Sequence, residues 1–191
     1  QIRKIHDVVV LSAGRTPVGG FLGSLASLSA VQLGSIALKS VIERADIQPN
    51  QVEEVILGNV CSAGLGQSPA RQAAIGAGIP TNAEALTVNK VCSSGLKAVS
   101  LATQSIKLGD RNIIAAGGME SMSNVPLYLQ RNIKYGNQKI IDGIINDGLW
   151  DPYNQIHMGN CAENSAKKFN ITREMQDEFT IKSYKRAEEA F

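Results

Sequence analysis

The sequence has little net charge, few aromatic residues and no long apolar run. Nineteen basic against seventeen acidic residues leave a formal net charge of +2, and only 5% of the 191 residues are aromatic. Charges this balanced and interspersed do not make the strong field of a dedicated nucleic-acid or membrane-surface binder. No apolar stretch approaches about 18 residues, so we expect no membrane span and no retained secretory signal. The 43% apolar share is enough to bury a core in one or two domains.

Cysteine is also scarce. Cys61, Cys92 and Cys161 are an odd number at wide spacing, without a C-x-x-C pair. This pattern fits a reducing compartment better than a disulfide framework. A zinc site of Cys61, Cys161 and His157 has no closely spaced ligand pair to support it, and we set it aside. We expect Cys61 and Cys161 to be buried as small hydrophobic residues.

The first 120 residues alternate short apolar runs with helical patterns. The predicted strands are 8–11, 55–57, 85–91 and 113–116, and the predicted helices are 29–46, 70–78 and 93–108. The continuous apolar run at 8–11 is typical of a strand covered on both faces. Strands that alternate with helices predict a largely parallel sheet in a layered α/β domain.

Local signals mark the ends of these helices. Ser29 and Gln32 form a capping box, and Ser68 followed by Pro69 starts the second helix. The first helix has an apolar face formed by Leu33, Ile36, Ala37 and Ser40. Gly109 stops the third helix, which is so rich in small residues that we expect it to be central, with protein on most sides.

After residue 120 the pattern becomes irregular, with only short apolar segments through 124–155. Two further helices are predicted, over about 161–169 and from the cap Thr172 through Tyr184. The last helical pattern reaches Phe191 without a stop signal, so we expect this chain to be the front part of a longer polypeptide.

Cys92 lies between a predicted strand and a predicted helix, which places its sulfur at the helix N-terminus. Unpaired N–H groups and the positive end of the helix dipole favour thiolate over thiol there. The same N–H groups can stabilise the oxyanion formed when sulfur attacks a carbonyl, and Gly95 permits close approach of another backbone or a ligand. The alternative is a buried cysteine at a strand end, which position alone does not exclude.

Several segments, in order along the chain, resemble the thiolase family. They are Arg15-Thr16-Pro17 with Gly20-Phe21, the run Asn89–Ala98 around Cys92, Gly117-Gly118-Met119-Glu120-Ser121-Met122-Ser123, and His157-Met158-Gly159 followed by Ala162-Glu163-Asn164. The histidine segment resembles the acetoacetyl-CoA thiolase branch, and Asn160–Lys168 is similar to its eukaryotic mitochondrial, potassium-activated type.

The resemblance implies a fold class and a domain organisation. The fold is α/β, the layered α-β-α-β-α arrangement of thiolases, of which this chain holds the first half and the start of an inserted loop domain. The N-terminal α/β domain would cover 1–120, with its last strand missing, and the beginning of the loop domain would cover 121–191.

The resemblance also implies site residues. Cys92 carries the acyl group as a thioester, and its own backbone N–H contributes to an oxyanion hole. Leu149, His157 and Met158 would line the coenzyme A tunnel, and Tyr184 would lie near both coenzyme A and a potassium ion. Each of these four has a structural alternative: Leu149 and Met158 as core residues, His157 as a hydrogen-bonded structural histidine, and Tyr184 as a helix-face anchor.

The implied reaction converts two acetyl-CoA into acetoacetyl-CoA and free coenzyme A, with coenzyme A as substrate and no covalent cofactor. The Gly-His-Pro and Cys-x-Gly-Gly-Gly segments that supply the family's general base and second cysteine are absent here. The 191 residues alone are therefore expected to be inactive in the Claisen condensation. Alternatives are a broader 3-ketoacyl-CoA thiolase, a silent half-thiolase that only dimerises or binds coenzyme A, and a β-ketoacyl-acyl carrier protein synthase.

The family further implies a homodimer or homotetramer, with part of 126–140 in tetramer contacts, and neither a nucleic-acid partner nor a membrane span. The mitochondrial matrix is the implied compartment, with the cytosol as the alternative.

Overall fold

The computed structural model describes residues 7–190, and the chain divides into two compact units, Gln1–Gly148 and Leu149–Phe191. The predicted domain boundary after residue 120 stays a prediction, and within the structure 121–148 groups with the first unit.

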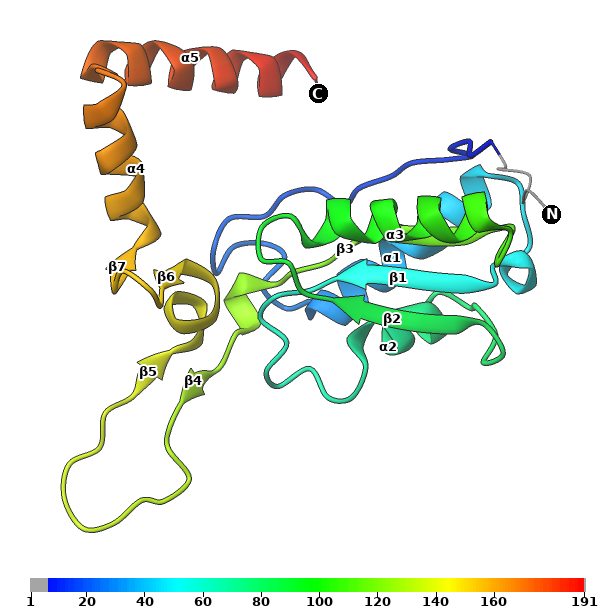
Figure 1. The fold of residues 1–191 in the computed structure, drawn as a ribbon, viewed down its shortest axis with the longest axis horizontal. Helices are drawn as coiled ribbons and strands as arrows, with labels where there is room; N and C mark the ends of the chain where they lie inside the picture. Colours follow the sequence, from blue (N-terminus) through cyan, green and yellow to red (C-terminus); the bar gives the residue numbers. More distant parts are fainter. Residues whose placement is uncertain (1–6, 191) are drawn as a thin grey trace. The chain divides into compact units, whose positions relative to one another are not determined.

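A parallel three-stranded sheet forms the centre of the first unit (Figure 1). Its strands are β1 (Glu54–Gly58), β2 (Glu84–Val88) and β3 (Ile114–Gly118), in the order β2-β1-β3. At the carboxyl edge Gly58 pairs with Val88 and with Gly118, so the three strands end side by side. The parallel strands predicted in this region are confirmed.

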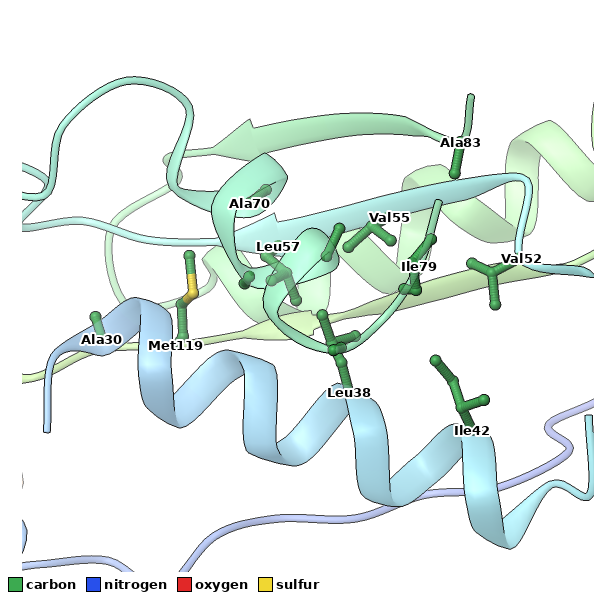
Figure 2. Packing of buried hydrophobic residues seen from close by; sticks show 13 residues of the cluster. Ala30, Leu38, Ile42, Val52, Val55, Leu57, Ala70, Ile79, Ala83 and Met119 are labelled. Atoms are coloured by element: carbon green, nitrogen blue, oxygen red, sulfur yellow. The ribbon is translucent and has the colours of Figure 1, made fainter. Parts of the chain in front are cut away.

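Helices cover both faces of this sheet, because β1 sends alternate side chains to opposite sides. Val55 and Leu57 belong to the core under α1 (Ala30–Arg44) and α2 (Pro69–Gly76), and Figure 2 shows them facing Leu38. Ile56 packs on the other face with small residues of α3 (Ser94–Leu108). A short 3-10 helix, η1 (Pro49–Gln51), precedes β1.

The predicted capping box of α1 is confirmed. The Gln32 N–H donates to Ser29 Oγ at 3.2 Å, and the Ser29 N–H donates to Gln32 Oε1 at 2.8 Å. The predicted apolar face is wrong: the buried row is Ala30, Gly34, Leu38 and Ile42, and Ile36 is 51% exposed. Close packing decides this, since a Cβ on Gly34 would lie 2.6 Å from Met119 Sδ. The helix face that contains Gly34 therefore packs closely against the core, and the Leu38 and Ile42 side chains lie on the same face.

The predicted strand at 8–11 does not form. This segment joins none of the strands among the described residues, and Val9, Val10 and Leu11 are exposed. Just beyond it, the chain lies against α1, where Arg44 Nη1 donates to the Ala13 carbonyl at 3.2 Å. An apolar run becomes a strand only where a sheet edge receives it, and 8–11 meets none here.

Helix α3 ends as predicted at Gly109, which adopts the left-handed conformation with a φ of 77°. Its expected central position is not realised within the described chain. Only Ser94, Ala98 and Ala102 are buried, whereas Leu96 on the opposite side is 74% exposed.

A hairpin completes the first unit. Its strands are β4 (Leu127–Tyr128) and β5 (Ile141–Asp142), which pair antiparallel. The 3-10 helix η2 (Met122–Asn124) precedes the hairpin, and the π-helix η3 (Ile145–Leu149) follows it, with Leu149 as the first residue of the second unit. Asn124 Nδ2 donates to the carbonyls of Ala26 and Leu28, both at 3.0 Å. These bonds tie the base of the hairpin to the segment before α1.

The second unit contains one short hairpin and two helices. Strands β6 (Trp150–Asp151) and β7 (Ile156–His157) pair antiparallel, and α4 (Met158–Lys168) and α5 (Arg173–Glu189) follow. Both predicted helices are confirmed, and the predicted cap Thr172 accepts from the Met175 N–H at 3.3 Å. Over the whole described range, no helix is both long and apolar enough to cross a membrane.

Candidate active site

Cys92 lies in the turn that joins the carboxyl end of β2 to the first residue of α3. The side chain is exposed, and the N-cap of the helix is the next residue, Ser93. The structure thus confirms that Cys92 directly precedes the N-cap of a helix, and within the described chain Cys92 is exposed, not buried.

Hydrogen bonds hold the turn from both sides of Val91. The Ser94 hydroxyl accepts from the Lys90 N–H at 2.8 Å and donates to the Val91 carbonyl at 2.6 Å. The Asn89 side-chain oxygen accepts from the Val91 N–H at 3.0 Å. The amide N–H groups of Ser93 and Ser94 are also occupied, donating to the carbonyls of Lys90 and Val91.

Val91, the residue before the cysteine, has a φ of 48°. For a β-branched residue this left-handed conformation is an outlier, and such strain costs about 1–3 kcal/mol. Strain of this kind persists only where surrounding contacts impose it, and it gathers at functional sites.

Glycines let the first turn of α3 approach the carboxyl edge of the sheet. A Cβ on Gly58 would lie 2.6 Å from the Gly95 nitrogen and from the Ser94 Cβ, and one on Gly118 would lie 3.3 Å from the Gly95 Cα. The close approach predicted at Gly95 is confirmed, and the neighbours are the backbones of β1 and β3. Contact between backbones therefore sets the distance from the strand ends to the first turn of α3, which directly follows the Cys92 turn.

A buried amide and a carboxylate join the ends of β1 and β3. Asn59 is buried, and its Nδ2 donates to the Met119 carbonyl at 3.2 Å and to Glu120 Oε1 at 2.9 Å. Glu120 Oε2 accepts from the N–H groups of Val60 and Cys61 at 3.0 and 3.4 Å. This network holds the two strand ends that support the Cys92 turn.

The three cysteines lie in different environments. Cys61 is buried as predicted, and burial, followed by the charges of Glu120, Asp147 and Asp142, raises its pKa to about 11. Cys161 is only half-buried on α4, contrary to the expectation that it is core. Cys92 alone combines exposure with a helix N-terminus.

A cavity of about 500 Å³ opens at the carboxyl ends of β1 and β2. Its lining includes Asn59, Ser68, Thr87 and Asn89. Thr87 Oγ1 accepts from the Ala70 N–H at 3.0 Å, an interaction that occupies one free amide of the first turn of α2. Ser68 is at the predicted N-cap position, but its side chain makes no cap hydrogen bond.

Three of the other predicted site residues come together in the second unit. Pairing of Trp150 with His157 brings Leu149 and Met158, the residues just outside the paired positions, to the same end of the hairpin. His157 is the N-cap of α4, and its Nδ1 accepts from the Gly159 N–H at 2.9 Å. With Nδ1 acting as acceptor, the proton of a neutral imidazole is on Nε2 and can be donated elsewhere.

Tyr184 stands apart on α5 and is 75% exposed. A role of Tyr184 at a potassium site stays a prediction. The described part of the chain does not contain a group of three His, Cys, Asp or Glu side chains able to hold a metal.

Sequence reasoning missed the residues that shape the Cys92 turn, namely Asn89, Val91 and Ser94 together with Asn59 and Gly58. A polar residue directly after an apolar strand, as at Asn59, was an available signal. Val91 carried no signal, because no local pattern predicts a left-handed valine.

Comparison with known proteins identifies the relatives of this chain. The model of the thiolase N-terminal domain matches residues 8–191. The chain is 54% identical over 187 residues to an acetyl-CoA acetyltransferase of Yarrowia lipolytica, covering 98% of this chain and 47% of the relative. A mitochondrial acetyl-CoA acetyltransferase of Rattus norvegicus is also 54% identical over 188 residues, covering 98% and 44%.

A solved structure agrees. The crystal structure of the Acat5 thiolase from Ascaris suum in complex with coenzyme A is similar with a TM-score of 0.91 and 46% identity, covering 94% of this chain and 47% of that one. The chain thus spans about half the length of the relatives it matches. The fold, the placement of Cys92 and the match over 8–191 together show that this chain belongs to the thiolase family, as a thiolase N-terminal domain.

Proposed function

We propose that the polypeptide carrying this chain is an acetoacetyl-CoA thiolase, an acetyl-CoA C-acetyltransferase that interconverts two acetyl-CoA with acetoacetyl-CoA and coenzyme A. The observation that carries the proposal is the exposed Cys92 sulfur at the start of α3, in a chain 54% identical to acetyl-CoA acetyltransferases.

In the first half-reaction the Cys92 thiolate attacks the carbonyl carbon of acetyl-CoA. The new carbon–sulfur bond to Cys92 replaces the bond to coenzyme A, which leaves as a thiolate and takes up a proton. The Cys92 N–H donates to the developing oxyanion, a type of contact whose loss costs about 10²–10³ in rate. The N–H groups of Ser93 and Ser94 are already bonded within the turn.

The second half-reaction needs a base that removes a proton from the methyl group of the second acetyl-CoA. This chain has two histidines, His6, which lies outside the described residues, and His157, which caps α4. Neither belongs to a Gly-His-Pro segment, so the base and the second cysteine are not supplied by the 191 residues. A positioned base contributes about 10²–10⁴-fold, and the chain alone is therefore inactive in condensation.

Labelling of the natural full-length polypeptide tests the role of Cys92. Incubation with acetyl-CoA followed by digestion is expected to add one acetyl group to the peptide that spans residues 90–97. Iodoacetamide should alkylate Cys92 at least about tenfold faster than Cys61 or Cys161. An unmodified 90–97 peptide, or equal alkylation of all three thiols, would favour the silent half-thiolase instead.

Leu149, His157 and Met158 are proposed to line the pantetheine and acyl end of the coenzyme A tunnel. Two variants separate binding from helix capping at His157. His157→Asn keeps a good N-cap acceptor, whereas His157→Ala removes it. If the imidazole contacts substrate, both variants raise KM for acetoacetyl-CoA alike, and only His157→Ala lowers stability. A normal KM in His157→Asn would leave His157 with the capping role alone.

The competing enzyme is a broader 3-ketoacyl-CoA thiolase. A chain-length profile decides between them, because the acetoacetyl-CoA enzyme should lose activity as the substrate lengthens. For the acetoacetyl-CoA enzyme we also propose activation by potassium through Tyr184. Replacement of KCl by choline chloride should lower the rate if other parts of the polypeptide complete the cation site around this phenol.

Assembly and compartment are proposed from the same kinship. A homodimer or homotetramer is expected, and size-exclusion chromatography of the intact polypeptide as a monomer would contradict it. Relatives in Rattus norvegicus, Bos taurus and Xenopus laevis are named mitochondrial, which supports the mitochondrial matrix over the cytosol. Fractionation of cells of the source organism tests this.

A further inference from the structure

We propose that Ser94 is a positioning residue for Cys92, whose buried hydroxyl holds Val91 in its left-handed conformation and thereby presents the cysteine sulfur at the start of α3. This inference rests on the proposed function, because it assigns a residue that orients the nucleophile of that reaction.

Both peptide groups of Val91 are held by hydrogen bonds. Its carbonyl accepts from the Ser94 hydroxyl at 2.6 Å and from the Ser94 N–H at 3.1 Å. Its N–H donates to the Asn89 side chain at 3.0 Å. The Ser94 oxygen also accepts from the Lys90 N–H, so one hydroxyl joins the residues before and after the bend.

The backbone needs such a restraint at this residue. A φ of 48° is unfavourable for valine, and the Val91 side chain is 50% exposed, so its own packing cannot impose the conformation. If Val91 relaxes to a negative φ, the peptide that follows rotates and takes Cys92 with it. The restraint therefore acts directly on the direction of the nucleophile.

Ser94 is buried where two segments pack closely. It is 4% exposed, and a Cβ added to Gly58 would lie 2.6 Å from the Ser94 Cβ. Alanine fits the space but lacks the hydroxyl that bonds Lys90 and Val91. This hydroxyl does not cap α3, because the N-cap is Ser93.

The test compares variants of the natural full-length polypeptide. Ser94→Ala should slow both iodoacetamide alkylation of Cys92 and its acetylation by about tenfold or more, because small misplacements of a reacting group have large effects on rate. It should lower kcat and leave KM for acetyl-CoA nearly unchanged, since the buried hydroxyl touches no substrate. Thr103→Ala is the matched control: it removes one hydroxyl bond to the Val99 carbonyl on the same helix.

The double variant Val91→Gly with Ser94→Ala provides the decisive readout. Glycine adopts positive φ without strain, so the clamp is no longer needed and most of the lost rate should return. A merely structural loss at Ser94 would not be rescued by this change. If Ser94→Ala does not fold, Asn89→Ala removes the exposed half of the clamp and should slow alkylation about threefold.

Two results would overturn the inference. The first is a rate of Cys92 alkylation in Ser94→Ala within twofold of the parent, or in Asn89→Ala if Ser94→Ala does not fold. The second is a double variant that is alkylated as slowly as Ser94→Ala. Failure of the proposed function looks different. In that case the parent polypeptide takes up no acetyl group at Cys92, and the alkylation rates still report the effect of Ser94.

Discussion

The parallel sheet in the first unit is built differently at the two ends of its strands, here called the carboxyl edge and the amino edge. At the carboxyl edge Gly58 and Gly118 bring the strand ends into backbone contact with Gly95 of α3. At the amino edge the contacts are polar and partly exposed: Arg111 Nη2 lies 2.6 Å from Glu84 Oε1. Asn112 likewise donates to both oxygens of Glu53.

This difference matters for function because ligands of open parallel α/β sheets bind beyond the carboxyl ends of the strands. Backbone packed on backbone cannot adjust, so it holds the Cys92 turn in one geometry. Polar contacts near solvent exchange with water at little cost. The carboxyl edge is therefore expected to be intolerant of substitution and the amino edge tolerant.

The largest effect is expected for Gly58→Ala. Its new Cβ would be 2.6 Å from backbone atoms of Ser94 and Gly95, and neither can move as a side chain does. We expect the free energy of unfolding to fall by about 3 kcal/mol or more in urea titration. Gly117→Ala is the control, because its nearest neighbour would be Leu57 Cδ2 at an ordinary 3.8 Å. Equal losses in both would refute the backbone-contact argument.

Removal of the buried amide at Asn59 should have the next largest effect. Asn59→Ala leaves the Met119 carbonyl and one Glu120 oxygen without this donor. A loss of about 1–3 kcal/mol in the free energy of unfolding is expected. Asn82→Ala, an exposed asparagine near the amino edge, should stay within about 0.5 kcal/mol. A neutral Asn59→Ala would mean that the carboxyl edge tolerates loss of this network.

Loss of the ion pair at the amino edge should matter little. The Arg111 and Glu84 side chains are 31% and 65% exposed, so Arg111→Ala should cost about 0–1 kcal/mol, less at high salt. Thermal unfolding at low and high salt measures this. A cost that matches Gly58→Ala would remove the distinction between the two edges.

The smallest effect concerns pH. Hydrogen bonds from Asn112 lower the pKa of Glu53 from 4.5, so the ionised carboxylate stabilises the fold above pH 4.5. This contribution is lost as the pH falls through the lower folded-state pKa. Asn112→Ala removes the side-chain hydrogen bond to Glu53. The free energy of unfolding of this variant should therefore lie below that of the parent by the full amount at pH 7, and the difference should shrink as the pH falls below 4.5. A constant difference across acid titration would refute the linkage.

Local signals predicted much of the first unit. The apolar run at 55–57 became β1, the Ser29 capping box starts α1, and Gly109 ends α3. These features depend on residues a few positions apart, so the sequence displays them. The strand expected at 8–11 does not form, because a strand needs a partner strand that lies far away in the sequence. The buried face of α1 was predicted wrongly, because a glycine such as Gly34 does not count as apolar in a hydrophobic pattern.

The candidate site divides in the same way. The strand, Cys92 and the helix follow one another directly along the chain, so the sequence alone predicted that Cys92 lies at a helix N-terminus. Only tertiary structure decided how that turn is held, because Gly58, Ser94 and Gly118 come from three segments that meet at one sheet edge. Contacts between distant segments set side-chain orientation, and no local pattern encodes them.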